Sequence, residues 1–580
     1  MEKIFEDLKN KTSPAPFGKM NTKSKIKYTL GEPDSLAAQI KRCGVNGEIV
    51  ADDASIEQYS NDYSIFKIKP NAVVFPKNAD DVGKLVQFVK ANKKKNPNLS
   101  ITARSAGTDM TGGPLNDSII VSFTKHMNEM KEVGSDYAVV EPGVYFRDLE
   151  KELDKRGLMY PAAPASKDLC ALGGMVSNNS GGERSLNYGK TENFVESLKV
   201  VFADGKLYDI KPLSASELKK KIAGKSFESV IYRKIYNLIE KNYDAIKKAK
   251  PDVSKNSAGY DLWNVWDRKT FDLTKLFVGA QGTLGLVTEA KLRMVKKKKF
   301  SRLIVVFAKT LDPVPGLVEA VLPFKPESIE SYDDKTMELA MKFLPAILKM
   351  MKGSAISLAF KFIPEFIMIL KGGFPKMIIL IEVASDSESE LFRKMDLIKK
   401  AALKFPVQAR IIKDEAEEEK YWTIRRQSFA LLHSHVKGLE AAPFVDDIIV
   451  KPEYMSEFLP KVNAILDKHK DKLIYTIAGH PGNGNFHIIP LVDLKDPEIP
   501  GIISEVMDEV YKIVLEYGGS ITAEHNDGLI RGPYLEEMYG KKIYKLFEET
   551  KKIFDPLDIF NPRKKIGIDK RYSFSFMKKQ

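Results

Sequence analysis

The chain has 580 residues, which is too long for one ordinary hydrophobic core, so its length predicts at least two domains. Hydrophobic residues make up 43% and charged residues 29%, which is typical of a folded protein and excludes a disordered or fibrous chain. The only two cysteines are Cys43 and Cys170, which excludes a disulfide framework and an iron–sulfur cluster and fits a reducing compartment.

The net charge of +13 comes mostly from scattered lysines, with runs such as KANKKKNP at 90–97 and VKKKKF at 295–300. Nucleic-acid sites interleave arginine and aromatic residues on one face, and we find no such pattern, so we expect no nucleic-acid partner. A solvated lysine-rich surface is the simpler interpretation, and an anionic membrane surface or an acidic partner is the alternative. The first residues contain no apolar signal region, so we expect a cytoplasmic protein, either free or peripheral on the inner face of the cytoplasmic membrane.

The first half of the chain shows short strands and glycine turns. The run AVVFP at 72–76 predicts a strand, and apolar residues at helical spacing then follow a capping Asn78 or Asp80. LSITARS returns as a strand, so these three elements predict a βαβ unit, and FADGK predicts a hairpin. The tract at 274–295 predicts a strand, a glycine loop and a second strand, and the lysine run after it predicts a domain boundary.

The second half alternates strands, such as RLIVVFA and MIILIEVAS, with helices, which predicts an α+β architecture. The segment 337–375 is rich in Met, Ile, Leu and Phe, but lysines interrupt it. It contains no run of about 18 uncharged residues, which argues against a transmembrane helix. It is either a buried helical hairpin or an interfacial segment with lysines extending to lipid headgroups. The patterns therefore divide the chain into a leader and helix at 1–60, a first domain at 61–297, a second domain at 298–540, and a helix and tail at 541–580.

Three glycine-rich loops lie in the first domain. The first, ARSAGTDMTGG at 103–113, offers successive backbone N–H groups to an anion, although a plain tight turn explains it equally well. The second, at 161–191, surrounds Asn178 and Asn179 with four glycines and is long for a simple connection. The third is GAQGTLG at 279–285. Three such loops on one β-rich domain indicate a large, extended ligand that contains a diphosphate.

Two short motifs, GHPGNGNFH at 479–487 and AEHNDG at 523–528, bring together His480, His487, Glu524 and His525. Two histidines and one glutamate are a common ligand set for a divalent metal that keeps a position open for substrate. His525 would then remain free as a base. A purely structural role, in which the histidines cap loops, is the alternative.

The first-domain motifs, from PNAVVFPKNADDV through RSAGTDMTGG and LGGMVSNNSGG to GAQGTLGLVTEA, resemble the FAD-binding domain of the vanillyl-alcohol-oxidase/p-cresol-methylhydroxylase (PCMH) superfamily. GHPGNGNFH, AEHNDG and FDPLDIFNP resemble its FAD-linked D-2-hydroxyacid dehydrogenases, such as the D-lactate and D-2-hydroxyglutarate dehydrogenases and the glycolate oxidase D-subunit. The resemblance extends over 45–567 and implies an α+β fold. In that fold a PCMH-type FAD-binding domain of two α+β subdomains joins an α+β cap domain with an antiparallel sheet and a C-terminal helical segment.

The resemblance assigns roles residue by residue. It implies that Arg425 binds the substrate carboxylate, that His525 is the catalytic base, and that His480, His487 and Glu524 bind zinc, manganese or iron. Some relatives attach flavin through a histidine, and none occurs in the first two glycine loops, so FAD is expected to bind non-covalently. The residues implied to bind FAD are Arg104, Ser105, Ala106, Gly107, Thr108, Asp109, Ser166, Gly173, Gly174, Asn178, Gly181, Gly182, Gly282 and Gly285.

The chain departs from the family motifs at four places. Asn483 replaces an aspartate in GHxGDGNxH, the usual GEHG reads AEHN at 523–526, GSEGTLG reads GAQGTLG, and NPGK reads NPRK. The implied ligands and base survive all four changes. The altered neighbours leave the substrate and the strength of metal binding open.

The resemblance implies oxidation of a D-2-hydroxy acid by hydride transfer to flavin N5, assisted by the metal and a histidine base. The electrons would pass to a quinone, a separate iron–sulfur subunit or an electron-transfer flavoprotein. One alternative is a non-redox transferase similar to alkyl-dihydroxyacetone-phosphate synthase, whose consecutive histidine run is missing here. The other is a non-catalytic flavin subunit of an iron–sulfur complex.

Overall fold

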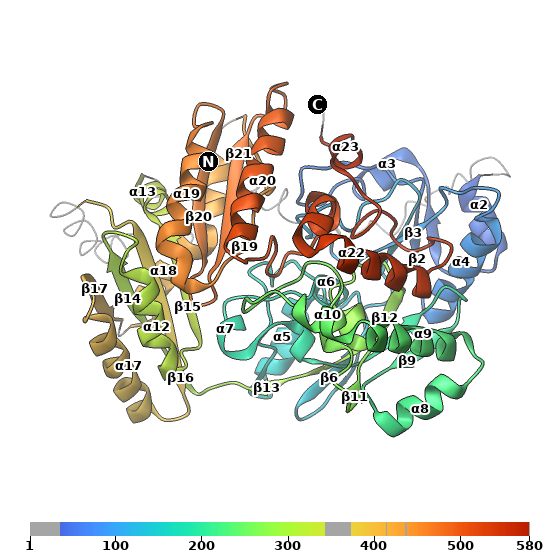
Figure 1. Cartoon of the computed structure of the whole chain (residues 1–580), viewed down its shortest axis with the longest axis horizontal. Helices are drawn as coiled ribbons and strands as arrows, with labels where there is room; N and C mark the ends of the chain where they lie inside the picture. The colour runs from blue at the N-terminus through green and yellow to red at the C-terminus, as the bar shows by residue number, and fades with distance from the viewer. Residues whose placement is uncertain (1–34, 343–372, 413, 436–437, 579–580) are drawn as a thin grey trace, which may run out of the picture.

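The computed structural model describes residues 35–342, 373–412, 414–435 and 438–578. Two lobes lie side by side (Figure 1). The N-terminal half of the chain forms one lobe, residues from 300 onward form most of the other, and the last helices return to the first lobe. The segment at 337–375, for which we expect a hairpin or an interfacial segment, lies mostly outside the described residues.

The first lobe begins with a four-stranded sheet in the order β1-β2-β4-β3. The predicted βαβ unit is present, with the side chain of Asn78 capping the crossover helix by accepting a hydrogen bond from Asp81 N. However, β4 lies between β2 and β3 and runs parallel to both. The elements are α2 (Leu36–Arg42), β1 (Glu48–Val50), α3 (Asp53–Glu57), β2 (Ala72–Phe75), α4 (Ala79–Asn92), β3 (Ile101–Arg104) and β4 (Ile119–Ser122).

A five-stranded antiparallel sheet in the order β5-β6-β12-β8-β9 forms the other layer of this lobe. Its strands are β5 (Met130–Val133), β6 (Tyr137–Val140), β8 (Val195–Val201), β9 (Leu207–Ile210) and β12 (Leu286–Arg293), and the FADGK hairpin joins β8 to β9 as predicted. Two small pairs are β7 (Leu158–Met159) with β13 (Val295–Lys296), and β10 (Leu213–Ser214) with β11 (Thr270–Phe271). The helices are α5 (Phe146–Asp154), α6 (Leu172–Asn178), α7 (Ser185–Tyr188), η1 (Thr191–Asn193), α8 (Ala215–Ala223), α9 (Phe227–Lys241), α10 (Tyr243–Lys248) and η2 (Leu262–Asn264).

One local prediction is wrong. The run before the third glycine loop is the short helix α11 (Thr274–Phe277), not a strand. Asp272 accepts hydrogen bonds from the backbone N–H and the hydroxyl of Thr274, which starts a helical turn. The strand prediction rested on the apolar residues of this run, and so short a run does not separate a strand from one turn of helix.

The second lobe contains an antiparallel sheet in the order β17-β14-β16-β15-β20-β21-β18, and β19 also pairs with β21. Its strands are β14 (Phe300–Ala308), β15 (Ser328–Asp333), β16 (Met377–Ser385), β17 (Val407–Ile411), β18 (Glu440–Ala441), β19 (Ile448–Ile449), β20 (Leu473–His480) and β21 (Asn485–Val492). Its helices are α12 (Val314–Val321), η3 (Leu322–Phe324), α13 (Asp334–Lys342), α17 (Glu388–Ala402), α18 (Glu415–His435), η4 (Pro452–Tyr454), α19 (Met455–Asp467) and α20 (Ile499–Glu516).

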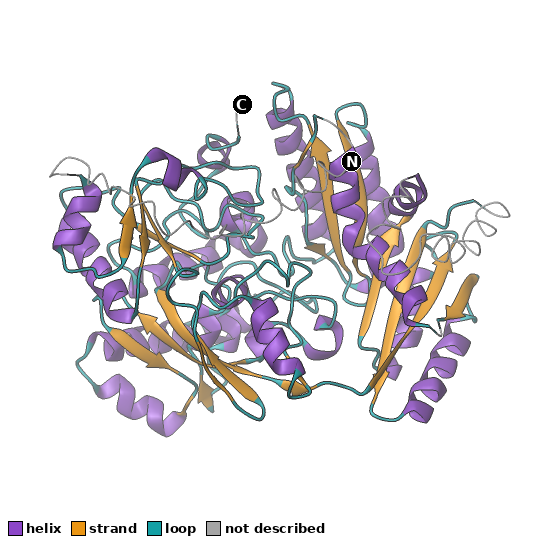
Figure 2. Cartoon of the chain, turned by 180° about the vertical axis from the view of Figure 1, so that it is seen from behind, coloured by secondary structure: helices purple, strands orange, loops and turns teal. Residues whose placement is uncertain are grey.

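Helices cover both faces of this sheet (Figure 2). In β14, Ile304 and Val306 pack into the core with α12, α17, α19 and α20, whereas Leu303 and Val305 pack against α13 and α18. Successive side chains of a strand point to opposite faces, so a sheet covered twice requires an uninterrupted apolar run. This explains why the sequence RLIVVFA lacks the polar alternation of a half-exposed strand.

The C-terminal part contains α21 (Gly528–Arg531), η5 (Gly532–Tyr534), α22 (Leu535–Phe554), which has a kink at Gly540, and α23 (Lys570–Phe574). After α22 the chain returns to the first lobe, where Asn561 Nδ2 donates to the carbonyls of Gly113 and Gln281. The protein is therefore α+β, as predicted. Among the residues that the structure describes, no helix has the length and apolar character needed to cross a membrane.

Candidate active site

The three glycine loops line one cleft of the first lobe. Asp109 holds two of the loops together, because its Oδ1 accepts from the backbone N–H groups of Thr111 and Gly113 and its Oδ2 accepts from Asn178 Nδ2 at 2.7 Å. The expected flavin residues that line the cleft are Arg104, Ser105, Ala106, Gly107, Thr108, Asp109, Gly173, Gly174, Asn178, Gly282 and Gly285. Ser166, Gly181 and Gly182 are not among its lining residues.

Close approach of these loops depends on the missing side chain at Gly173. A Cβ atom there would lie 2.5 Å from Pro142 Cβ and 2.7 Å from Ser105 Oγ, so only glycine lets α6 approach the first loop this closely.

The two histidines of the first motif lie on the hairpin of β20 and β21. His480 pairs with Asn485 across the hairpin, so His480 and His487 lie on the same face of the two strands. Their ring centroids are 5.1 Å apart. The hairpin therefore directs both imidazoles to one point.

The second motif supplies the third donor at that point. The Nε2 atoms of His480 and His487 are 3.1 Å apart, and Glu524 Oε1 lies 3.2 Å and 3.3 Å from them. Ligand atoms around an ion at about 2.1 Å are separated by about 3.0 Å in octahedral and about 3.4 Å in tetrahedral geometry. These three atoms therefore have the chemistry and the spacing of a divalent-metal site.

Buried carboxylates hold both histidines from the opposite side. The register of β15 with β20 places Glu330 opposite His480, and Glu330 Oε1 accepts from His480 Nδ1 at 2.5 Å. Asp446 Oδ1 accepts from His487 Nδ1 at 3.1 Å. Such contacts fix the tautomer that directs Nε2 to a metal, which is usual for metal-binding histidines.

A different grouping, Asp447, His487, Glu524 and His525, has one donor atom from each residue within 4.8 Å of the others. The Asp447 carboxylate, however, already accepts hydrogen bonds from neighbouring residues of the protein. Its Oδ2 accepts from Thr522 Oγ1 and from the backbone N–H groups of Glu524 and His525. Asp447 therefore positions the loop that carries Glu524, and His480 completes the tighter set.

His525 lies beside this set, and its ring stacks on His487 with centroids 4.9 Å apart. Its Nδ1 donates to Asp446 Oδ2 at 2.5 Å, so Asp446 bridges two histidines. Burial lowers the pKa of His525, but Asp446 and Asp447 outweigh burial and raise it. The side chain is 27% exposed, which leaves the far side of the ring accessible.

Charged neighbours shift the pKa values of two of the three donors. Burial lowers the pKa of His487, yet hydrogen bonds with Asp446 and Glu524 raise it to about 10. Burial raises the pKa of Glu524, but Lys255, 3.1 Å from Oε2, and His480 hold it well below its usual value. A position that favours a proton this strongly also favours a divalent cation in place of that proton.

Arg425, from α18, lies next to the histidines, because its Nη2 is 3.1 Å from Oε2 of Glu330, the carboxylate that pairs with His480. The structure thus brings together Arg425, His480, His487, Glu524 and His525, which are separated by up to 100 residues. The sequence reasoning missed Glu330, Asp446 and Lys255. The signal for Asp446 was a pair of acidic residues within an otherwise apolar run, FVDDIIV, whereas SIESYD around Glu330 carries no such signal.

Comparisons with known families match residues 70–211 to an FAD binding domain and residues 302–565 to the C-terminal domain of FAD linked oxidases. The chain therefore carries an FAD binding domain followed by a C-terminal domain of the FAD linked oxidases, and the predicted FAD-binding domain is confirmed. The cleft and its glycine loops fit this cofactor, since a bound diphosphate needs unhindered backbone N–H groups.

Curated relatives have low sequence identity to this chain. D-2-hydroxyglutarate dehydrogenase of Escherichia coli (strain K12) is 28% identical over 91% of this chain and 51% of that protein. Glycolate oxidase subunit GlcD of Bacillus subtilis (strain 168) is 26% identical over 87% and 91%, and D-lactate dehydrogenase of Anaerostipes hadrus is 24% identical over 93% and 99%. The chain spans about half the length of the first curated relatives that it matches.

Solved structures with the same fold include 4-ethylphenol oxidase from Gulosibacter chungangensis, with a TM-score of 0.64, 17% identity and coverage of 94% of this chain and 99% of that one. Another is p-cresol methylhydroxylase, with a TM-score of 0.63, 15% identity and coverage of 90% and 94%. These similarities confirm the predicted PCMH-type fold.

Proposed function

We propose that this protein is an FAD-dependent dehydrogenase that oxidises a D-2-hydroxy acid, such as D-lactate, D-2-hydroxyglutarate or glycolate, to the 2-oxo acid. The observation that carries the proposal is the convergence of three metal-type donors, His480, His487 and Glu524, beside His525 and Arg425. The names of the relatives support it, because each is a dehydrogenase or oxidase of a 2-hydroxy acid.

Each residue has a chemical task in this reaction. The planar guanidinium of Arg425 would bind the substrate carboxylate through two hydrogen bonds. His525 donates from Nδ1 to Asp446, which leaves Nε2 as the acceptor for the hydroxyl proton. Asp446 also stabilises the imidazolium that forms. A divalent cation on the donor set would lower the pKa of the hydroxyl, and bound FAD would supply the hydride acceptor.

The proposal extends to partners. Reduced flavin would pass its electrons to a quinone, a separate iron–sulfur subunit or an electron-transfer flavoprotein. We also propose that the protein associates with an anionic membrane surface, because its net charge of +13 would attract it to acidic lipids. Weaker binding to anionic vesicles at high salt would support it, and no binding at low salt would contradict it.

The test is anaerobic mixing of the purified flavoprotein with D-lactate, D-2-hydroxyglutarate, glycolate and the L-forms of the chiral acids, while flavin absorbance is recorded. We expect one acid to bleach the flavin, and we expect a chelator to abolish bleaching until metal is restored. A yellow protein that no acid bleaches would favour a non-redox transferase or an accessory flavin subunit. A colourless protein that takes up no FAD would contradict the cofactor assignment itself.

A further inference from the structure

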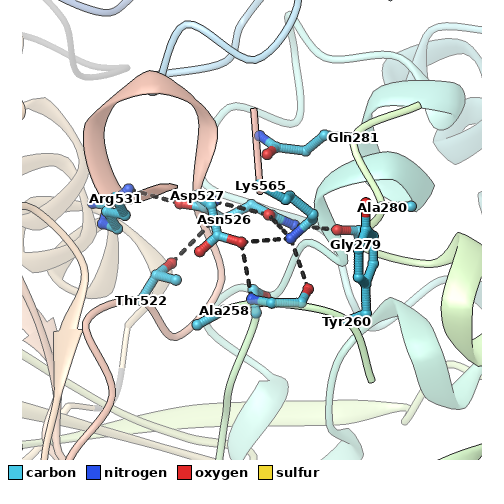
Figure 3. A network of polar contacts seen from close by, with 12 residues as sticks. Ala258, Tyr260, Gly279, Ala280, Gln281, Thr522, Asn526, Asp527, Arg531 and Lys565 are labelled. Atoms are coloured by element: carbon cyan, nitrogen blue, oxygen red, sulfur yellow. Dashed lines mark hydrogen bonds and ion pairs between the residues drawn. The ribbon is translucent and has the colours of Figure 1, made fainter. Parts of the chain in front are cut away.

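A buried polar network joins the C-terminal segment to the loop that carries His525 (Figure 3). The Lys565 ammonium donates to Gly259 O at 2.8 Å, to Asn526 Oδ1 at 2.7 Å and to Asp527 Oδ2 at 2.6 Å. The side chains of Lys565 and Asp527 are both 0% exposed. All three donors of the ammonium are therefore used, and Asp527 balances its charge.

Asn526, which directly follows His525, connects this network to the flavin cleft. Its Nδ2 donates to Gly279 O at 2.8 Å and to Asn178 O at 3.1 Å, in two of the glycine loops. Its Oδ1 accepts from Lys565 and from Asp527 N. One amide therefore links the loop of the base to two of the three flavin-lining loops, and Lys565 and the backbone N–H of Asp527 together fix which way this amide faces.

The backbone at this position makes the choice of asparagine informative. Asn526 has φ +73°, a left-handed conformation that glycine adopts most easily. Asparagine tolerates this conformation better than most residues with a side chain, and what it adds over glycine here is its set of side-chain hydrogen bonds. A second link lies two residues on, where Gly528 N donates to Gln281 Oε1 at 2.9 Å.

We infer that Asn526, oriented by Lys565, is a positioning residue that sets the distance between His525 and the bound flavin. The inference rests on the proposed function, in which the base and the hydride acceptor must address the same carbon of one substrate. Catalysis is sensitive to such spacing, since a misplacement of about 1 Å costs about a hundredfold in rate. The segment around Lys565 thereby becomes part of the active site, although it touches no substrate.

The first test is Asn526→Gly, which keeps the left-handed backbone without strain and removes only the amide. We expect kcat per bound flavin to fall about tenfold to a hundredfold while KM changes less than about threefold. We also expect the visible circular dichroism of the oxidised flavin to shift, because the carbonyls of Asn178 and Gly279 lose their donor.

The second test separates positioning from stability. Lys565→Met leaves Asp527 charged and buried, whereas the double variant Lys565→Met/Asp527→Asn removes both charges. We expect Lys565→Met to lose both stability and kcat per bound flavin. We expect the double variant to recover much of the stability but not the kcat, because Asn526 Oδ1 still lacks the hydrogen bond from Lys565.

Lys551→Met is the matched control. Lys551 is also a buried lysine of the C-terminal segment, and it bonds to Asp555 at 2.6 Å and to the carbonyls of Phe560 and Thr283. It therefore supports the third glycine loop without bonding to the loop 523–528, so it tests the link to the base loop specifically. We expect it to lower stability yet to keep kcat per bound flavin within about twofold of the wild type.

Equal kcat per flavin in Asn526→Gly and Lys551→Met, with an unshifted dichroism spectrum, would overturn the inference. Failure of the proposed function looks different, because then no 2-hydroxy acid reduces the wild-type flavin. In that case the dichroism of Asn526→Gly and the hydrogen exchange of loop 525–528 still decide whether the amide holds this loop against the flavin.

Discussion

Asp446 is the position where one substitution tests both halves of the proposed site. Its carboxylate accepts hydrogen bonds from the Nδ1 atoms of His487 and His525. Asp446→Asn keeps the shape, but an amide offers one oxygen and one NH2 group, so it accepts from only one of the two rings. The other ring must take the opposite tautomer. If that ring is His487, its Nε2 no longer binds metal, and if it is His525, its Nε2 no longer accepts a proton.

The expected magnitudes follow from these two roles. Loss of a carboxylate behind a metal-binding histidine weakens metal affinity about 10- to 100-fold, which equals about 1.4–2.7 kcal/mol. Loss of a correctly oriented general base costs about 10²–10⁴ in rate. We therefore expect Asp446→Asn to bind metal about 10- to 100-fold more weakly if His487 is the ring that changes tautomer. If it is His525, we expect the variant to be at least about a hundredfold slower than the wild type at saturating metal.

The assay is a metal titration of flavin reduction by the acid that bleaches the wild-type flavin, with metal content measured in parallel. Asp272→Asn is the control, because it alters another buried aspartate, one that accepts from Thr274 at the start of α11 and bonds to neither histidine. We expect it to lower stability but not kcat at saturating metal. Wild-type metal affinity together with the full wild-type rate in Asp446→Asn would refute the reasoning, since neither His487 nor His525 would then depend on Asp446.

Three further predictions follow from packing and burial. Gly181→Ala places a Cβ 2.5 Å from Glu524 Oε2, so we expect this variant to bind metal more weakly and to retain FAD. In the control Gly501→Ala nothing lies within 4 Å of the new Cβ, so metal and FAD binding should both stay unchanged. Equal metal contents in the two variants would contradict the expectation. Ile381→Ala at the fully buried centre of β16 should cost about 2–5 kcal/mol in denaturant unfolding, and a loss below about 1 kcal/mol would show that the core there is loosely packed. Burial lowers the pKa of the Lys564 ammonium to about 8, so folding opposes its protonation. Between about pH 8 and pH 10.5 the wild type should therefore gain stability relative to Lys564→Met as the pH rises. Melting temperatures of the two proteins that change with pH in parallel would contradict this.

Local patterns predicted much of the fold because short-range physics decides those features. The apolar run of β14, the capping residue Asn78 and the turn between β8 and β9 each act within a few residues, and each has the predicted form. The run at 274–277 failed because the Asp272 side chain starts a helical turn there, a local hydrogen bond that hydrophobicity does not reveal. The position of β4 between β2 and β3 was not predictable either, since strand order depends on contacts between distant segments.

In the site, too, features decided by neighbouring residues were predictable, and features decided by contacts between distant segments were not. Spacing within one hairpin was sufficient to expect His480 and His487 at one point, because their separation fixes the face on which they lie. The partners that orient them could not be found this way: Glu330 precedes His480 by 150 residues and meets it only through the register of β15 with β20. Lys565 is similarly brought to Asn526 by the return of the chain after α22.

The separation of the site's components along the chain also bears on whether one lobe could act alone. Glu524 lies on a loop of the second half, yet its Oε2 contacts Lys255 of the first lobe and leaves no room for a side chain at Gly181. Asn526, two residues on, donates to carbonyls of the flavin loops. Contacts from the first lobe therefore help to place Glu524, and we expect a separately expressed second domain to bind metal more weakly than the whole chain. Equal metal affinity for that isolated domain, measured on folded protein, would show that the contacts between the lobes only support a site that is already complete.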